Sequence, residues 1–174
     1  MSGEVATRPL QAGDTVVDFN LGDVDGHLFT TAQARRQGLV LIVLFKTGCG
    51  TCKYSAPFLQ RLHEQYAANS GGRFQVIGIS QDDASATREF AAQQGGLTFP
   101  LLLDTELEVS ERYAITHVPN LYLLDTRDTI QHAIVGHFSR DEFNRLAQIA
   151  ATEVGIPYSP IVRAEDDAPA LKPG

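Results

Sequence analysis

The sequence lacks most of the features that mark a specialised class of protein. It has two cysteines and no tryptophan in 174 residues. This excludes a secreted scaffold held by several disulfides, which needs more cysteines at wider spacings. Lysine and arginine total 14 against 21 acidic residues, a net charge of −7. With no basic stripe, we expect no binding to nucleic acid. The longest apolar run, residues 39–45, is too short to cross a bilayer.

The N-terminus does not resemble an export signal. Residues 1–10 contain neither a basic segment nor the apolar segment that a secretory signal requires. We therefore expect a cytoplasmic protein with no membrane contact, or a periplasmic one if an export signal was removed.

The hydrophobic pattern predicts one α/β domain. A chain of 174 residues is long enough for one sizeable core. Residues 39–45 are apolar on both faces, as in a central strand covered by helices on each side. The expected order β-β-α-β-α-β-α-β-β-α implies a mixed sheet flanked by helices on both faces. We expect an N-terminal arm over 1–13, the domain over 14–154 and an irregular tail over 155–174, for which no role is predicted.

Periodicity and capping residues place the individual elements. Strands are expected over 16–21, as an edge strand or hairpin, and over 39–45, 74–80, 99–104, 120–124 and 129–135. Helices are expected over 31–36, from Cys49 to about 68, from Asp82 and Asp83 as caps to about 94, over 106–113, and after the cap Ser139 to 154.

The two cysteines form a Cys-x-x-Cys pair at the junction of a buried strand and a helix. The free N–H groups and the dipole at a helix N-terminus favour a thiolate at Cys49, the expected nucleophile. Cys52 follows one turn later, where it can attack a mixed disulfide formed by Cys49 and act as the resolving thiol. Between them, Gly50 and Thr51 let the turn close without bulk.

No metal or other cofactor is expected. Zinc normally takes four ligands, and the Cys-x-x-Cys pair supplies two. The one histidine pair at suitable spacing, His132 and His137, falls in a predicted strand. Its odd spacing there is expected to point the two side chains to opposite faces.

Two segments resemble the thioredoxin superfamily. Residues 45–57 resemble the active-site segment of thioredoxins, including the Ala-Pro step that ends at Pro57 and kinks the helix. Residues 113–120 resemble the loop that carries the family's cis-proline. The resemblance implies a thioredoxin fold, a cis Val118–Pro119 bond, and substrate-binding backbone at Gly48, Gly50, Thr51, Val118 and Pro119.

Other segments resemble the redoxin branch, which contains TlpA- and ResA-type thioredoxins and relatives of alkyl hydroperoxide reductase. They are residues 18–26, residues 78–83, and residues 98–100 with Asp104. This branch has an insertion between the active-site helix and the cis-proline, in agreement with the 67 positions from Cys52 to Pro119. The resemblance covers about residues 14–150.

Three positions depart from the family pattern. Gly48 replaces the tryptophan that usually precedes the first cysteine, which leaves the face around Cys49 more open. Val43 and Ser55 stand where thioredoxins and ResA-type proteins, respectively, place an acidic proton acceptor for the second cysteine. A buried thiol without a nearby base keeps a high pKa, so we expect slow release at Cys52. Lys46 and Lys53 could stabilise a thiolate but are predicted to be solvated surface cations. Tyr54 and His117 are weaker candidates, and His117 is predicted to be a partly buried loop histidine.

The predicted function is reduction of protein disulfides by a Cys49/Cys52 dithiol–disulfide cycle. The partners would be protein or small-molecule disulfides and an upstream thiol reductant, with the chain a monomer or weak dimer. Two alternatives stay open. A peroxiredoxin-like thiol peroxidase is disfavoured because Lys46 and Ile42 replace the Thr or Ser and the Pro of its site. A non-catalytic interaction or metal-handling module is the other.

Overall fold

The protein is built on one mixed five-stranded sheet. The computed structural model describes residues 5–174. The strand order is β5-β4-β3-β6-β7, with β3 and β4 parallel, β4 and β5 parallel, and β6 antiparallel to both β3 and β7. The strands are β3 (Leu39–Phe45), β4 (Phe74–Ser80), β5 (Leu101–Leu103), β6 (Asn120–Leu124) and β7 (Ile130–Val135).

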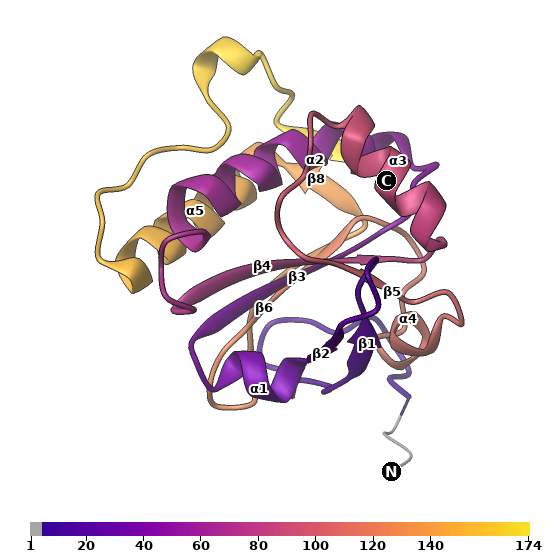
Figure 1. Cartoon of the computed structure of the whole chain (residues 1–174). Helices are drawn as coiled ribbons and strands as arrows, with labels where there is room; N and C mark the ends of the chain where they lie inside the picture. The colour runs from indigo at the N-terminus through magenta and orange to yellow at the C-terminus, as the bar shows by residue number, and fades with distance from the viewer. Residues whose placement is uncertain (1–4) are drawn as a thin grey trace.

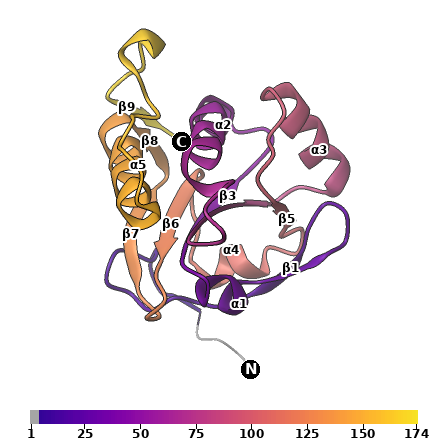
Figure 2. The same cartoon turned by 60° about the vertical axis from the view of Figure 1, so that its left-hand side comes forward.

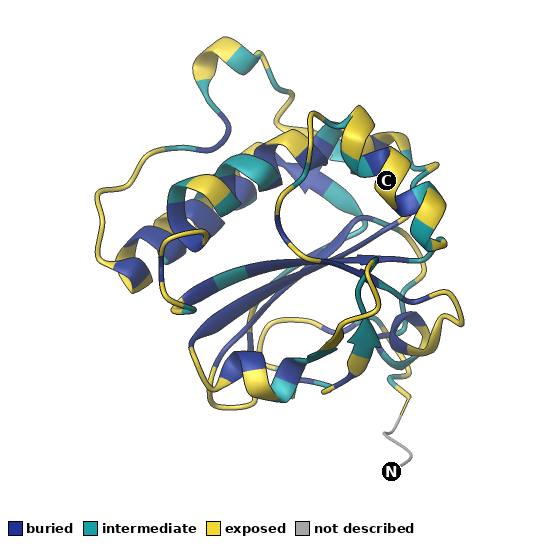
Figure 3. Ribbon diagram, in the orientation of Figure 1, coloured by how far each residue is buried: buried dark blue, intermediate teal, exposed yellow. Residues whose placement is uncertain are grey.

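Helices cover both faces of this sheet, as the sequence predicts (Figures 1 and 2). One layer holds α2 (Gly50–Leu62), α3 (Ala84–Gln93) and α5 (Arg140–Val154); the other holds α1 (Thr31–Arg35) and α4 (Glu108–Arg112). Alternate residues of β3 face opposite layers: odd-numbered ones join the core beneath α2 and α5, and even-numbered ones join the core beneath α1. The central strands β3 and β6 are therefore buried along their whole length (Figure 3).

An N-terminal hairpin lies outside the main sheet, as expected. It pairs β1 (Asn20–Gly22) with β2 (Leu28–Thr30) in antiparallel register. The predicted arm is described from residue 5, and its first four residues lie outside the described range. Leu10 of the arm packs into the core on the α1 side.

Local capping chemistry sets the helix boundaries. The Asp83 carboxylate caps α3 by accepting the Ala86 N–H, and the Ser139 hydroxyl caps α5 by accepting the Glu142 N–H. Both capping roles agree with the prediction. The helix expected to reach about residue 68 is α-helical only to Leu62 and continues as a π-helical turn over His63–Ala67.

The C-terminal segment is more ordered than the sequence indicates. Residues 155–174 were expected to be irregular, yet they contain a 3-10 turn (Ala164–Asp166) and end in strand β9 (Leu171–Pro173). β9 pairs antiparallel with β8 (His137–Ser139), a strand that the sequence pattern did not predict. Ile161 and Val162 are buried against the main core. Among the described residues, no helix is long and apolar enough to cross a membrane.

Candidate active site

Cys49 is the last residue of the short loop that connects β3 to α2. It is the N-cap residue of α2, and its Sγ accepts the Cys52 N–H at 3.1 Å. An amide hydrogen aimed at the sulfur and the positive end of the helix dipole both stabilise negative charge there. The side chain is half-buried, so its sulfur is within reach of a substrate.

Cys52 occupies the opposite environment. It is 3% exposed. Burial raises the pKa of its thiol far above the ordinary value, and hydrogen bonding to the Cys49 side chain raises it further. The pair therefore combines one accessible sulfur and one enclosed, protonated thiol a single helical turn apart.

The space behind Cys52 is apolar. A narrow cavity there is lined by Val43, Ser55, Phe90 and Pro119 among other residues, and no carboxylate belongs to the described residues that line it. The Ser55 hydroxyl donates to the Thr51 carbonyl at 2.8 Å. Neither of the two positions where relatives carry an acid thus offers a free proton acceptor to the Cys52 thiol.

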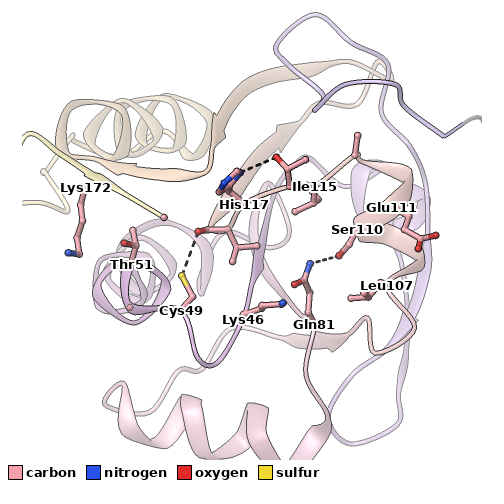
Figure 4. A pocket seen from close by; sticks show the side chains of 15 residues that line it. Lys46, Cys49, Thr51, Gln81, Leu107, Ser110, Glu111, Ile115, His117 and Lys172 are labelled. Atoms are coloured by element: carbon pink, nitrogen blue, oxygen red, sulfur yellow. Dashed lines mark hydrogen bonds between the residues drawn. The ribbon is translucent and has the colours of Figure 1, made fainter.

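The loop before β6 approaches the nucleophile through its backbone. The Val118–Pro119 peptide bond is cis, as the resemblance implies. The Cys49 S–H donates to the Val118 carbonyl at 3.6 Å (Figure 4). The contact brings the backbone of the cis-proline loop to the sulfur of the expected nucleophile.

Asn120 holds this loop, although the sequence analysis assigned it no role. It is fully buried. Its Nδ2 donates to the His117 carbonyl at 2.6 Å, and its Oδ1 accepts the Gly136 N–H at 2.6 Å. A buried amide side chain must satisfy both its donor and its acceptor. An asparagine directly after a predicted cis-proline, at the start of a buried strand, was the available signal.

Asp82 holds the other side of the site. It was predicted as a helix cap, but Asp83 takes that role, and the Asp82 carboxylate instead accepts the Thr47 N–H at 2.7 Å and the Thr47 hydroxyl at 2.9 Å. These two bonds fix the loop that leads into Cys49. The prediction named the right helix boundary and missed this loop contact.

An open cavity of about 710 Å³ lies beside Cys49. Apolar side chains on either side of α4, Leu107 before it and Ile115 after it, form one wall. Gln81 donates to Ser110 of α4 at 2.8 Å (Figure 4). Its volume falls in the range typical of small-molecule sites. The described residues that line it are Lys46, Cys49, Gly50, Thr51, Gln81, Leu107, Ser110, Glu111, Ala114, Ile115, Thr116, His117, Val118, Lys172 and Gly174.

The predicted site residues are distributed unevenly around this cavity. Gly50, Thr51 and Val118 line it with Cys49, whereas Pro119 lines the inner cavity behind Cys52. Gly48 is exposed, and Lys46 and Lys53 are exposed as expected. His117 is exposed too, so the expectation of a partly buried ring is wrong. Pro57 lies inside α2, and Tyr54 packs edge-on against Phe58 and Phe138.

The histidine pair does not behave as the strand pattern predicts. His132 lies in β7, but Gly136, with φ +74°, interrupts the strand before His137. Both rings consequently approach one carboxylate: Glu142 lies 3.8 Å from His132 Nε2 and 2.9 Å from His137 Nε2. The expectation that the two side chains point to opposite faces is wrong, because it assumed an unbroken strand.

Known proteins share this architecture. The family model for the AhpC/TSA family matches residues 12–133. The chain is 25% identical to the thiol-disulfide oxidoreductase ResA of Geobacillus kaustophilus over 133 residues, which cover 76% of this chain and 74% of ResA. It is also 25% identical to the thioredoxin-like protein YneN of Bacillus subtilis over 139 residues, 78% of each chain.

Solved structures agree on the fold. The thioredoxin domain of a thiol-disulfide oxidoreductase from Bacteroides vulgatus superimposes with a TM-score of 0.69 at 19% identity, covering 81% of this chain and 99% of that one. The peroxidoxin BcpB of Mycobacterium tuberculosis gives 0.65 at 21% identity, covering 84% and 97%. The chain belongs to the AhpC/TSA family and has the thioredoxin fold, as the redoxin resemblance predicts. It is accordingly classed with the thioredoxin-like oxidoreductases.

Proposed function

We propose that the protein reduces disulfides through a Cys49/Cys52 dithiol–disulfide cycle. The observation that carries this proposal is the pairing of a half-buried sulfur, capped by a helix N-terminus, with a buried thiol one turn away. The names of the relatives ResA and YneN support the same class of chemistry.

The cycle has two exchange steps. The Cys49 thiolate attacks one sulfur of the substrate disulfide, the substrate S–S bond breaks, and one substrate thiolate leaves and takes a proton from solvent. Cys52 then loses its proton and attacks Cys49 Sγ. This forms the Cys49–Cys52 disulfide and releases the second substrate thiol. Two electrons pass to the substrate, and an upstream dithiol reductant restores both cysteines.

The second step is expected to be the slower one. The Cys52 thiol must ionise before it attacks, and its surroundings raise the pKa of that thiol. Neither Val43 nor Ser55 can accept the proton. The proton of Cys52 therefore has to pass to a water molecule that reaches the mixed disulfide, or to a base carried by the substrate.

Turnover of two disulfides tests the proposal. Reduced protein should reduce insulin or glutathione disulfide in the presence of excess dithiol, Cys49→Ser should abolish this, and Cys52→Ser should stop after one mixed disulfide. A protein that consumes hydrogen peroxide but neither disulfide would instead be a thiol peroxidase. The cytoplasmic location expected from the sequence stays a prediction, as does the monomer or weak dimer.

A further inference from the structure

The segment after α5 reaches back to the active site. It leaves the end of α5, returns along the helix layer, and places β9 beside β8 and next to the first turn of α2 (Figures 1 and 2). The Thr51 hydroxyl donates to the Pro173 carbonyl at 2.5 Å. This contact lies one residue from Cys52 and two residues from Cys49.

The backbone of Gly174 contacts the carbonyl that the nucleophile also contacts. A β-carbon added at Gly174 would clash with the Val118 carbonyl oxygen, so the chain passes directly against it. The Cys49 S–H donates to that same oxygen. The Gly174 N–H donates to the Gly136 carbonyl at 2.9 Å, which fixes the chain at this place.

The upstream part of this segment is firmly anchored. Ile161 and Val162 are buried, and their N–H groups both donate to the Asn144 side chain at 3.0 and 2.9 Å. Arg61 of α2 forms a two-bond ion pair with Asp166, at 2.6 and 2.9 Å. These contacts keep the segment on the surface of α2 and α5.

Strand β9 buries far less side-chain surface than the anchored part of the segment. Leu171 is 59% exposed, Lys172 is half-buried, and Pro173 is exposed. β9 is attached by backbone pairing with β8, by the Thr51 contact, by the Gly174 N–H bond to Gly136, and by the Lys172 ammonium over the Tyr54 ring at 5.9 Å. A short edge strand with little buried side-chain surface is one that another extended segment can replace.

We propose that residues 171–174 form a displaceable strand that determines which disulfides reach Cys49. A small disulfide enters through the open cavity and leaves β9 in place. An extended polypeptide that carries a disulfide must run past Cys49 on both sides, so it competes with β9 for the edge of β8 and for the Val118 backbone. The strand thus selects small disulfides over protein disulfides, and protein substrates gain access by taking its place. This inference rests on the proposed disulfide reduction.

Two variants loosen the strand without touching either cysteine. One lacks residues 171–174 and retains the anchors at 161, 162 and 166. The other, Gly174→Ala, adds the β-carbon that clashes with the Val118 carbonyl. Gly22→Ala is the matched control, because a β-carbon at Gly22 meets no atom within 4 Å. Thermal unfolding shows whether each variant is folded. If the shortened chain does not fold, Gly174→Ala alone is used for the test.

The readout is the ratio of kcat/KM for insulin to kcat/KM for glutathione disulfide. We expect the ratio to rise about fivefold or more in both variants, the factor that one net hydrogen bond represents, and to stay unchanged in Gly22→Ala. An unchanged or lower ratio in folded variants that still reduce glutathione disulfide overturns the displaceable strand alone. If the unaltered protein reduces neither probe and Cys52→Ser forms no mixed disulfide, the proposed function itself is overturned.

Discussion

The buried thiol of Cys52 should make the reduced protein less stable at alkaline pH. Its pKa is raised in the folded state by burial, so the thiol keeps its proton in the native protein at a pH where it ionises in the unfolded chain. The unfolded chain then binds fewer protons than the native protein. Stability from this group is complete below the unfolded pKa of about 8.5 and falls as pH rises above it.

The size of the effect follows from linkage. One pH unit above the unfolded value, at about pH 9.5, the loss is about 1.4 kcal/mol, because ten in eleven unfolded molecules have ionised there. Tyr113 and Tyr122 also have raised pKa values, that of Tyr122 to about 12. Tyrosine ionises in the unfolded chain only from about pH 10, so its contribution begins later.

Urea unfolding under a phosphine reductant measures this loss. The free energy of unfolding is compared between about pH 7 and about pH 9.5 for the unaltered protein, Cys52→Ser and Cys52→Ala. Every other titrating group is common to the three proteins, so the difference between their pH dependences isolates the Cys52 thiol. We expect the unaltered protein to lose about 1.4 kcal/mol more than either variant. Parallel pH dependences, within about 0.3 kcal/mol, would refute the reasoning, because they would mean that Cys52 ionises as freely in the fold as outside it.

Three further predictions concern reactivity and packing. Alkylation of the reduced native protein with iodoacetamide should modify Cys49 at least about a hundredfold faster than the buried thiol; mass spectrometry showing equal modification would contradict this. Phe138→Ala should lower the free energy of unfolding by about 3–5 kcal/mol, because this fully buried ring packs against three other aromatic rings beneath α2 and α5; a loss below about 1 kcal/mol in urea unfolding would contradict it. Gly38→Ala should cost about 1–3 kcal/mol, because its β-carbon would clash with the Arg73 carbonyl, while Gly22→Ala meets open space; equal stability of these two variants would contradict the packing described.

The central part of the fold was predictable because its signals are local. The seven apolar residues of 39–45 can be buried on both faces only in a central strand, and β3 has these bounds. Asp83 and Ser139 cap helices where the sequence places them, because capping depends on residues three positions away. The position of Cys49 at a strand–helix junction follows from the same local patterns.

The parts that escaped prediction depend on contacts distant in sequence. β8 and β9 have three residues each, too few to show a period, and each is stabilised by the other across more than thirty positions. Residues 155–174 are held in place by the ion pair between Arg61 and Asp166 and by the hydrogen bonds from the N–H groups of residues 161 and 162 to the Asn144 side chain. Composition rich in proline and acidic residues indicates an irregular chain but says nothing of the surface on which it packs.

The direct test of the central claim is identification of the sulfur that attacks. Reduced Cys52→Ser protein is mixed with one equivalent of glutathione disulfide, quenched in acid within seconds, digested and analysed by mass spectrometry. We expect stable glutathione on Cys49 in this variant, and in the unaltered protein glutathione on Cys49 at the earliest quench times, replaced at later times by the intramolecular Cys49–Cys52 disulfide. Failure of Cys49 to form the mixed disulfide would contradict this expectation. So would a Cys49→Ser variant in which Cys52 takes up glutathione as fast as Cys49 does in Cys52→Ser.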